Sequence, residues 1–266
     1  MSDHVVLTLW TNDPDTARVA DLAGIDRIGI DLDRLGKQAR QAGLGTWVSQ
    51  HTVEDLERVR PAITRAQLFV RSNPLHDGTP GEVERALAAG AEVLMLPMFR
   101  SAGELARYVE LVGGRARVVG LLETAEAVAE VETVAGVAGL DELHVGINDL
   151  ALALGLPNRF WVLLDPAAAR VARAAAAVGL PLGVGGIGRV TDPTLRIPPD
   201  LIYAQYPRLG ATAALISRSF LASDCDVATE VRRARERLAW WAGRPGAELD
   251  RAARALGDAL SAIGTF

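Results

Sequence analysis

The sequence predicts a single (β/α)8 (TIM) barrel with extra C-terminal helices, and three observations support this fold class. The chain has 266 residues, and such a barrel typically needs about 250. Strand-like apolar runs alternate with segments of helical periodicity along almost the whole chain. The hydrophobic content of 49% is enough for a large core. No glycine-rich dinucleotide motif follows the first strand, which disfavours an open doubly wound sheet.

Seven predicted strands are short apolar runs, and the eighth is undecided between two segments. Turn residues or helix caps bound each run, as expected for buried parallel strands. The eighth strand is either residues 201–204 or residues 213–216. The other seven are residues 5–10, 27–32, 67–72, 92–97, 118–123, 143–149 and 180–184.

Helices are predicted between the strands, several of them by capping residues. Asp13 precedes Pro14 at the start of the first helix, and Thr52 and Ser101 each precede an acidic residue three positions later. The predicted helices are residues 13–23, 52–62, 81–89, 101–111, 124–137 and 165–178, followed by 226–241 and 247–263. We therefore predict a catalytic barrel over residues 1–225. The helical extension over 226–266 packs on its own barrel or on a neighbouring subunit.

Composition narrows the classes of function. The net charge is −5 and no basic run or aromatic-basic stripe is present, so we expect no nucleic-acid partner. No apolar run is long enough to cross a membrane, and the N-terminus lacks the pattern of a secretory signal. The single cysteine, Cys225, excludes an intrachain disulfide and fits a reducing compartment. We expect a cytoplasmic protein.

Two carboxylates, Glu123 and Asp149, are the most informative residues of the chain. Each ends an apolar run typical of a buried strand, and one helical segment separates the runs. Parallel strands joined in this way bring both carboxylates to the same cavity. Hard divalent cations bind through one or two carboxylates and keep other positions open. The spacing predicts a site for Mg2+, or for Mn2+ or Co2+, although either residue is alternatively a helix N-cap.

The lysine content also favours a metal site over a Schiff-base mechanism. Lys37 is the only lysine, and it lies in a charged segment that we expect to be exposed. An enzyme that forms a Schiff base needs a lysine in a desolvated pocket. A metal is therefore the expected electron sink if the barrel stabilises a carbanion.

Further polar residues are predicted at the carboxyl ends of the strands, where the active site of such a barrel lies. Arg71 ends the third strand, and its guanidinium fork suits a carboxylate, with an ion pair to Asp31 as the alternative. His51 follows in a loop and is either a mobile base or a surface residue. The candidates are Arg71, Asp31, Asp33 and His51 for catalysis, and Trp10, Arg71, Asn148 and Pro97 for substrate binding.

The blocks around Glu123 and Asp149, residues 122–128 and 139–155, are similar to the HpcH/HpaI aldolase and citrate lyase β-subunit family. Arg71, residues 91–97 and Trp10 fit the same pattern, and the resemblance covers roughly residues 5–220. It implies a barrel of the phosphoenolpyruvate/pyruvate superfamily with a divalent cation on Glu123 and Asp149. It implies that Arg71 binds the carboxylate or enolate oxygen of a 2-oxo or acyl substrate. It also implies a trimer or hexamer in which a C-terminal helix packs on a neighbour.

The chain departs from the pyruvate aldolases of that family at two positions. Those enzymes carry an acid–histidine pair after the second strand, whereas this chain has Arg34 in the place of the histidine. Leu121 stands where they carry a glutamine. The acidic stretch from Asp31 to Asp33 is closer to the citrate lyase branch, but no basic site for the adenine phosphate of coenzyme A is evident.

The sequence therefore favours a metal-dependent carbon–carbon lyase of the aldolase or citrate lyase type, acting on a small carboxylate or acyl substrate. The cation would act as Lewis acid for the enolate of a 2-oxo acid or β-hydroxy acyl group. Asp31, Asp33 or a water on the cation would move the proton, with His51 as a further candidate. One alternative is a C–C hydrolase, thioesterase or tailoring enzyme of a secondary pathway on the same metal site. Another is a non-catalytic barrel subunit.

Overall fold

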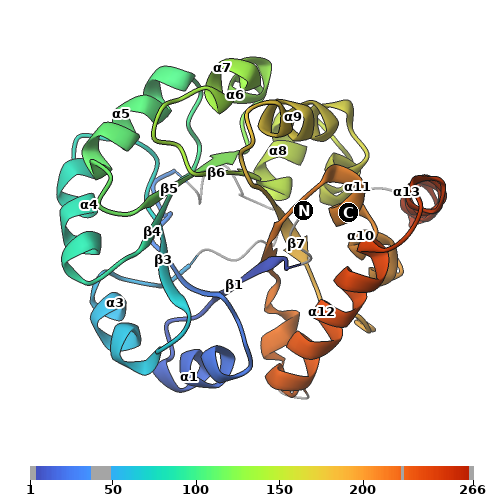
Figure 1. Ribbon diagram of the computed structural model, residues 1–266, viewed down its shortest axis with the longest axis horizontal. Coiled ribbons are helices and arrows are strands. Elements are labelled where there is room, and N and C mark those ends of the chain that lie inside the picture. The colour runs from blue at the N-terminus through green and yellow to red at the C-terminus, as the bar shows by residue number, and fades with distance from the viewer. Residues whose placement is uncertain (1–3, 37–48, 223–224, 264–266) are drawn as a thin grey trace.

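The computed structural model describes residues 4–36, 49–222 and 225–263. Within them eight parallel strands form a closed barrel, and β8 pairs with β1 (Figure 1). This confirms the predicted fold class. The eighth strand is the 213–216 segment, because residues 201–204 fall on helix α10 and its C-cap. The strands are β1 (Val6–Trp10), β2 (Arg27–Asp31), β3 (Gln67–Arg71), β4 (Val93–Leu96), β5 (Arg117–Leu122), β6 (Glu142–Val145), β7 (Leu182–Ile187) and β8 (Ala213–Ile216).

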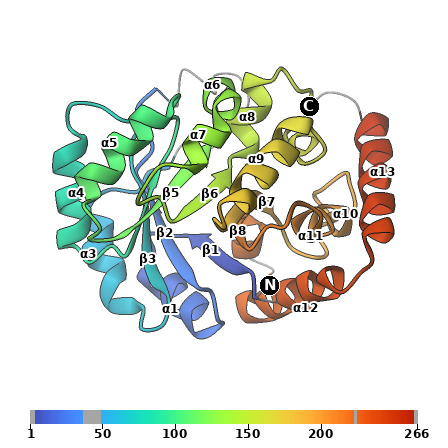
Figure 2. The ribbon, with the colours of Figure 1, turned by 45° about the horizontal axis from the view of Figure 1, so that its top comes forward.

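Helices surround the barrel (Figures 1 and 2). The helix predicted over 124–137 is two short helices, because Glu130 leaves helical geometry at φ −108° and ψ 20°. The helices are α1 (Pro14–Leu22), α3 (Glu54–Val59), α4 (Thr79–Ala88), α5 (Ala102–Val112), α6 (Ala125–Ala129), α7 (Val131–Ala135), α8 (Ile147–Ala153), α9 (Pro166–Ala177), α10 (Pro199–Tyr203), α11 (Gln205–Leu209), α12 (Val227–Ala242) and α13 (Gly246–Ile263). The described residues also form three short 3-10 helices, η1 (Arg60–Ala62), η2 (Arg159–Leu163) and η3 (Arg218–Leu221).

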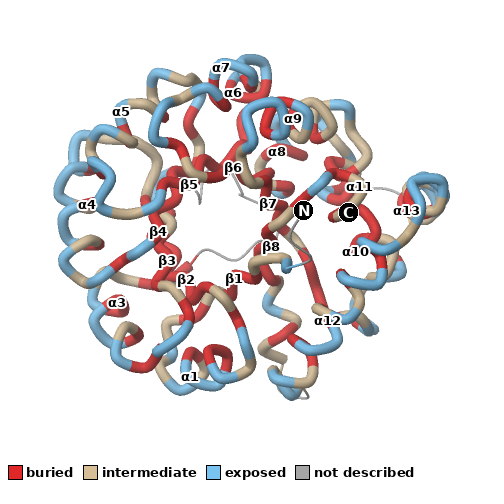
Figure 3. The backbone as a smooth tube through the Cα atoms, viewed as in Figure 1, coloured by how far each residue is buried: buried red, intermediate tan, exposed pale blue. Residues whose placement is uncertain are grey.

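Alternation along the strands divides the apolar side chains between two layers, and most strand residues are buried (Figure 3). Outward-facing residues such as Leu7 and Ile30 join the helices in the larger core. A smaller cluster fills the barrel interior: Trp10, Phe69, Val93, Met95, Val119, Leu121 and Leu215. Because side chains alternate with a period of two, Asp31, Arg71 and Glu123 continue the inward-facing rows at the carboxyl end of the barrel.

The opposite end of the interior holds a buried charge network. Arg27 and Glu142 begin β2 and β6, and the guanidinium donates to the carboxylate over 2.7 Å and 3.0 Å, with both side chains 2% exposed. The His144 Nε2 atom also contacts a Glu142 oxygen. Burial raises the pKa of Glu142, but His144 and Arg27 outweigh it and lower that pKa to about 2. Gly183 is required beside this network, since an added Cβ would lie 2.1 Å from the His144 ring.

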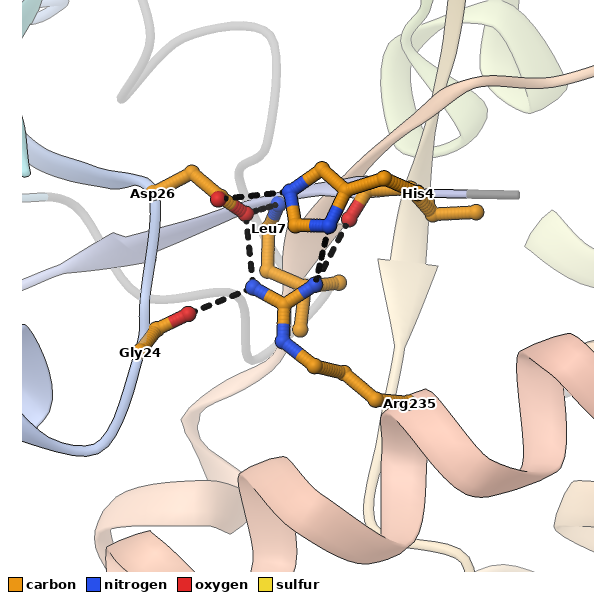
Figure 4. A network of polar contacts seen from close by, with 6 residues as sticks. His4, Leu7, Gly24, Asp26 and Arg235 are labelled. Atoms are coloured by element: carbon orange, nitrogen blue, oxygen red, sulfur yellow. Dashed lines mark hydrogen bonds and ion pairs between the residues drawn. The ribbon is translucent and has the colours of Figure 1, made fainter. Parts of the chain in front are cut away.

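Helix α12 closes the ring of helices next to α1. Arg235 anchors it, donating to the Val5 carbonyl over 3.1 Å and to Asp26 over 2.8 Å (Figure 4). Asp26 in turn accepts from the Leu7 N–H over 2.7 Å, so the contacts tie α12 to β1 and to the turn before β2. Because α12 occupies the position of the eighth barrel helix, the element outside the ring is α13.

Helix α13 packs on the barrel of its own chain. It contacts α10 and α11 through a buried face that includes Leu249, Leu256 and Leu260 (Figure 2). Intrachain packing therefore covers the apolar face that the sequence left without an assigned partner. Homo-oligomer formation stays a prediction. No helix in the described ranges is long and apolar enough to cross a membrane.

Candidate active site

Glu123 stands directly after β5, where it continues the inward-facing positions of Val119 and Leu121. It is 4% exposed, and its Oε1 accepts a hydrogen bond from the Met98 N–H over 3.0 Å. The interpretation of Glu123 as a helix N-cap is wrong. Thr124 caps α6 instead, its hydroxyl oxygen accepting from the Ala127 N–H over 3.2 Å. The Glu123 carboxylate therefore does not cap the N-terminus of α6.

Asp149 reaches the same pocket from a helix rather than a strand. Strand β6 ends at Val145, and Asp149 lies in the first turn of α8, whose N-cap is Gly146. The prediction that a strand extends to residue 149 is therefore wrong, because the chain enters the helix directly at Ile147. Glu123 and Asp149 nevertheless line one pocket of about 310 Å³. Gly146 leaves room for the Glu123 side chain, since an added Cβ would lie 2.7 Å from Glu123 Oε2.

The electrostatics of Glu123 fit a site for a cation. Burial and the nearby Asp149 carboxylate raise the pKa of Glu123 to about 8, against the opposing effect of Arg71. Two carboxylates that repel each other at close range are stabilised by a positive charge between them. No group of three or more histidine, cysteine or acidic residues with metal-binding geometry occurs in the described ranges. The two carboxylates of the pocket are a donor set suited to a hard cation, which leaves other positions to water or substrate.

Arg71 and Asp31 form a bidentate ion pair beside this pocket. They are direct neighbours in the pairing of β3 with β2, and the guanidinium Nε and Nη2 donate to the two carboxylate oxygens over 2.8 Å and 2.6 Å. Burial opposes the charge on Arg71, but Asp31 outweighs it and the pKa of Arg71 is raised. The ion pair that the sequence allowed as an alternative is therefore present. It holds the guanidinium in one orientation while Glu123 lies within its electrostatic reach.

Trp10 supports Arg71 from the barrel interior. Its ring lies 5.1 Å from the guanidinium carbon and meets Phe69 edge-on, with the ring centroids 5.4 Å apart. Gly29 makes room for this ring, because an added Cβ would lie 2.4 Å from it. The predicted substrate residue thus contacts the predicted carboxylate-binding arginine.

His51 is buried against Asp31, at 5% exposure. The interpretation of this loop histidine as a surface residue is wrong, because its Nδ1 accepts from the Asp31 N–H over 3.1 Å. A neutral ring in this arrangement carries its hydrogen on Nε2. Burial lowers the pKa of His51, with Asp31 and Asp55 opposing. Asp33 is also buried, and its N–H donates to Asp31 over 3.2 Å.

The remaining predicted residues lie around the same rim. Pro97 is buried at the end of β4, and Asn148 is exposed on the first turn of α8. Lys37 lies outside the described residues.

Met98 and Arg100 line the pocket, and the sequence placed both at the active face without giving either a role. Met98 has φ +56°, a left-handed conformation that a methionine does not signal in a sequence. Both residues follow strand β4 at the carboxyl end of the barrel, and this position is the feature of the sequence that could have identified them as pocket residues.

Comparison with known proteins finds a partial sequence match and similar folds. A hydroxypyruvate/pyruvate aldolase of Paraburkholderia phytofirmans is 32% identical over a stretch covering 38% of this chain and 52% of that protein. The match therefore spans about half of that relative's length. An HpcH/HpaI aldolase/citrate lyase family protein from Burkholderia cenocepacia has a similar structure, with a TM-score of 0.66 and 23% identity over 89% of this chain and 94% of its own. The citrate synthase SbnG has a TM-score of 0.61 at 18% identity, over 82% of this chain and 89% of its own.

The fold and the site define a (β/α)8-barrel protein with an acidic pocket and a half-buried arginine at its carboxyl face. The model of the HpcH/HpaI aldolase/citrate lyase family matches residues 5–183, and the chain belongs to that family.

Proposed function

We propose that the protein is a divalent-metal-dependent carbon–carbon lyase of the aldolase or citrate lyase type. Its substrate would be a 2-oxo acid or a β-hydroxy acyl compound, cleaved through an enolate. The observation that carries the proposal is the shared pocket of Glu123 and Asp149, where burial and the second carboxylate raise the pKa of Glu123 despite the nearby Arg71. Family membership and the partial match to a pyruvate aldolase support the same chemistry.

Glu123 and Asp149 would hold the cation, which supplies Lewis-acid polarisation of a carbonyl oxygen when bound. Mg2+ is the first candidate, with Mn2+ or Co2+ as substitutes. The Met98 N–H keeps one oxygen of Glu123 in place, so the carboxylate does not need to reorient on binding. Buried ligands of fixed orientation lower the reorganisation cost during a reaction.

Arg71 would stabilise the negative charge that develops on the substrate oxygen when the carbon–carbon bond breaks. Asp31 occupies two nitrogens of the guanidinium, so it sets the direction in which Arg71 faces the pocket. Trp10 fixes the same group from below. These contacts pre-organise a single cation rather than leave a flexible one at the rim.

Asp31, Asp33 and His51 are the candidates for proton transfer. His51 is neutral near pH 7, because burial lowers its pKa. With Nδ1 engaged by the Asp31 N–H, Nε2 is the atom through which His51 would donate a proton or a hydrogen bond. His51 thus brings an imidazole to Asp31 from the following loop, although Arg34 stands where the pyruvate aldolases carry theirs.

Calorimetry tests the proposal. Mg2+, Mn2+ and Co2+ would be titrated into the wild type and into Asp149→Asn, with and without oxalate as a mimic of a pyruvate enolate. We expect metal and oxalate to bind the wild type together and the variant weakly. Cleavage assays with 4-hydroxy-2-oxo acids and β-hydroxy acyl esters would then identify the substrate class. A wild type that binds no divalent cation would favour the non-catalytic barrel instead.

A further inference from the structure

Asn73 joins three elements at the carboxyl end of the barrel. It follows β3 and is half-buried, and both polar atoms of its amide are engaged. The oxygen Oδ1 accepts hydrogen bonds from the N–H groups of Arg34 and Leu35, over 2.9 Å and 3.1 Å. The nitrogen Nδ2 donates to Glu82 Oε1 on α4 over 2.8 Å. Because an ionised carboxylate only accepts hydrogen bonds, Glu82 sets the orientation of the amide. Asn73 therefore holds the segment after β2 in place.

Arg34 extends this support to His51. The backbone N–H of Arg34 is bonded to Asn73, and its Nη2 donates to the His51 carbonyl over 2.6 Å. Two more contacts act on the same histidine. The His51 N–H donates to Ser49 Oγ over 3.1 Å, and the ring Nδ1 accepts from the Asp31 N–H over 3.1 Å. The His51 backbone is thus held at both its N–H and its carbonyl, which fixes the direction in which the ring meets Asp31.

The charges around His51 favour a neutral ring with one defined tautomer. Burial lowers the pKa of His51, and Arg34 and Arg218 act in the same direction, whereas Asp31 and Asp55 oppose them. A neutral imidazole whose Nδ1 accepts a hydrogen bond carries its hydrogen on Nε2. In this arrangement Nε2 is a hydrogen-bond donor, and a ring that loses the contact with Asp31 becomes able to carry the hydrogen on Nδ1 instead.

We infer that Asn73 and Arg34 are positioning residues that hold His51 as a neutral hydrogen-bond donor; this inference rests on the proposed function. Such a donor stabilises an oxygen atom on which negative charge develops, rather than accepting a proton. Arg34, which stands where the pyruvate aldolases carry a histidine, would thus support a histidine that comes from the following loop. Asp31 and Asp33 are then the side chains that remain as candidates for the base.

Nitrogen NMR of the histidine rings tests the inference without an assay of activity. The chain has 4 histidines, so isotope-labelled histidine gives a simple spectrum in which His51→Gln assigns the His51 signals. We expect wild-type His51 to be a single tautomer with its hydrogen on Nε2. Asn73→Ala and Arg34→Gln should each add the Nδ1–H tautomer. Arg107→Gln, which removes a charge from an exposed site on α5, should leave the His51 signals as in the wild type.

An exchange of donor and acceptor separates the hydrogen bonds of Asn73 from a general effect on folding. In Asn73→Asp/Glu82→Gln, the new carboxylate can accept from the N–H groups of Arg34 and Leu35, and the new amide at position 82 can donate to it. We expect this double variant to restore the single tautomer that Asn73→Ala loses. A double variant that behaves like Asn73→Ala would contradict a role for these hydrogen bonds.

Exchange of the methyl protons of pyruvate with deuterium from heavy water, in the presence of Mg2+, measures the consequence for the proposed reaction. A C–H bond breaks, the proton passes to a base and to solvent, and the enolate takes up a deuteron in its place. The rate at saturating pyruvate should fall by about 10–100-fold in Asn73→Ala and Arg34→Gln, as for a displaced catalytic group. Their affinities for Mg2+ and oxalate should stay unchanged, and the double variant should recover the rate.

The outcomes separate this inference from the proposed function. Wild-type His51 with its hydrogen on Nδ1, or Asn73→Ala and Arg34→Gln variants that keep the wild-type spectrum, overturn the positioning role. Variants with a mixed tautomer and an unchanged exchange rate overturn its importance for the reaction. A wild type that exchanges no pyruvate protons and binds no oxalate with Mg2+ overturns the proposed function, and the histidine spectra still decide whether Asn73 and Arg34 position His51.

Discussion

Glu142 and Glu123 occupy opposite ends of the same barrel interior and differ in what balances their charge. Both are almost fully buried, at 2% and 4% exposure. Glu142 is bonded to Arg27 and His144, and its pKa is lowered to about 2. Glu123 faces Asp149, and its pKa is raised to about 8. Burial acts in the same direction on both, so the neighbours decide the difference. The chain balances the charge of Glu142 by itself, whereas the proposed cation would balance that of Glu123.

The largest effect on stability should come from a substitution that breaks the ion pair of Arg27 with Glu142. Glu142→Gln leaves Arg27 charged and uncompensated in the barrel interior, which should lower the free energy of unfolding by about 3–5 kcal/mol. Denaturant titration would measure it. The double variant Arg27→Met/Glu142→Leu removes both charges and should recover most of the loss. A single variant as stable as the wild type would show that the network contributes little to stability.

Acid should remove the contribution of Glu142 to the free energy of unfolding in a defined pH window. Because the pKa of Glu142 in the folded protein lies below its ordinary value of 4.5, its contribution is fully present above pH 4.5. It is lost as the pH falls from there toward about 2. The loss should approach about 3 kcal/mol. Unfolding followed at several pH values would show it, and the slope in this window should be shallower in the Arg27→Met/Glu142→Leu variant. Equal slopes in both proteins would assign the acid sensitivity to other carboxylates.

The variant Glu123→Gln tests the carboxylate at the other end of the barrel interior. Removal of a charge that faces Asp149 in a buried pocket should leave the stability of the metal-free protein unchanged or higher. Affinity for Mg2+ should fall by about 100-fold or more, because even residues that only orient a metal ligand cost 10–100-fold. Thermal unfolding and calorimetry on one preparation give both values. Unchanged Mg2+ affinity would remove Glu123 from the metal site.

The contrast also explains what the sequence revealed. Glu123 was recognisable because a carboxylate that ends an apolar run has few structural uses. Asp149 was recognised for its role but placed on a strand, because Ile147 and its neighbours are apolar in a strand as well as in the first turn of a helix. The fold was accessible because the alternation of strands and helices repeats along the whole chain.

Other features depend on tertiary contacts that local sequence does not contain. The pairing of Arg71 with Asp31 follows from the register of β2 with β3. The burial of His51 depends on where its loop meets β2. Arg100 was expected at the carboxyl end of the barrel but was given no role, because only the folded structure shows that it lines the pocket of Glu123 and Asp149.

The left-handed conformation of Met98 has an evolutionary consequence. Glu123 is held by the N–H of Met98, whereas the side chain of Met98 forms part of the pocket wall. A substitution at this position keeps the N–H and changes only the wall, so mutations here alter which molecules fit without disturbing the acid. Asparagine and glycine adopt positive φ more readily than methionine does, which makes them easily tolerated replacements. At position 98 a substitution is thus expected to reshape the pocket wall while the backbone contact to Glu123 is kept.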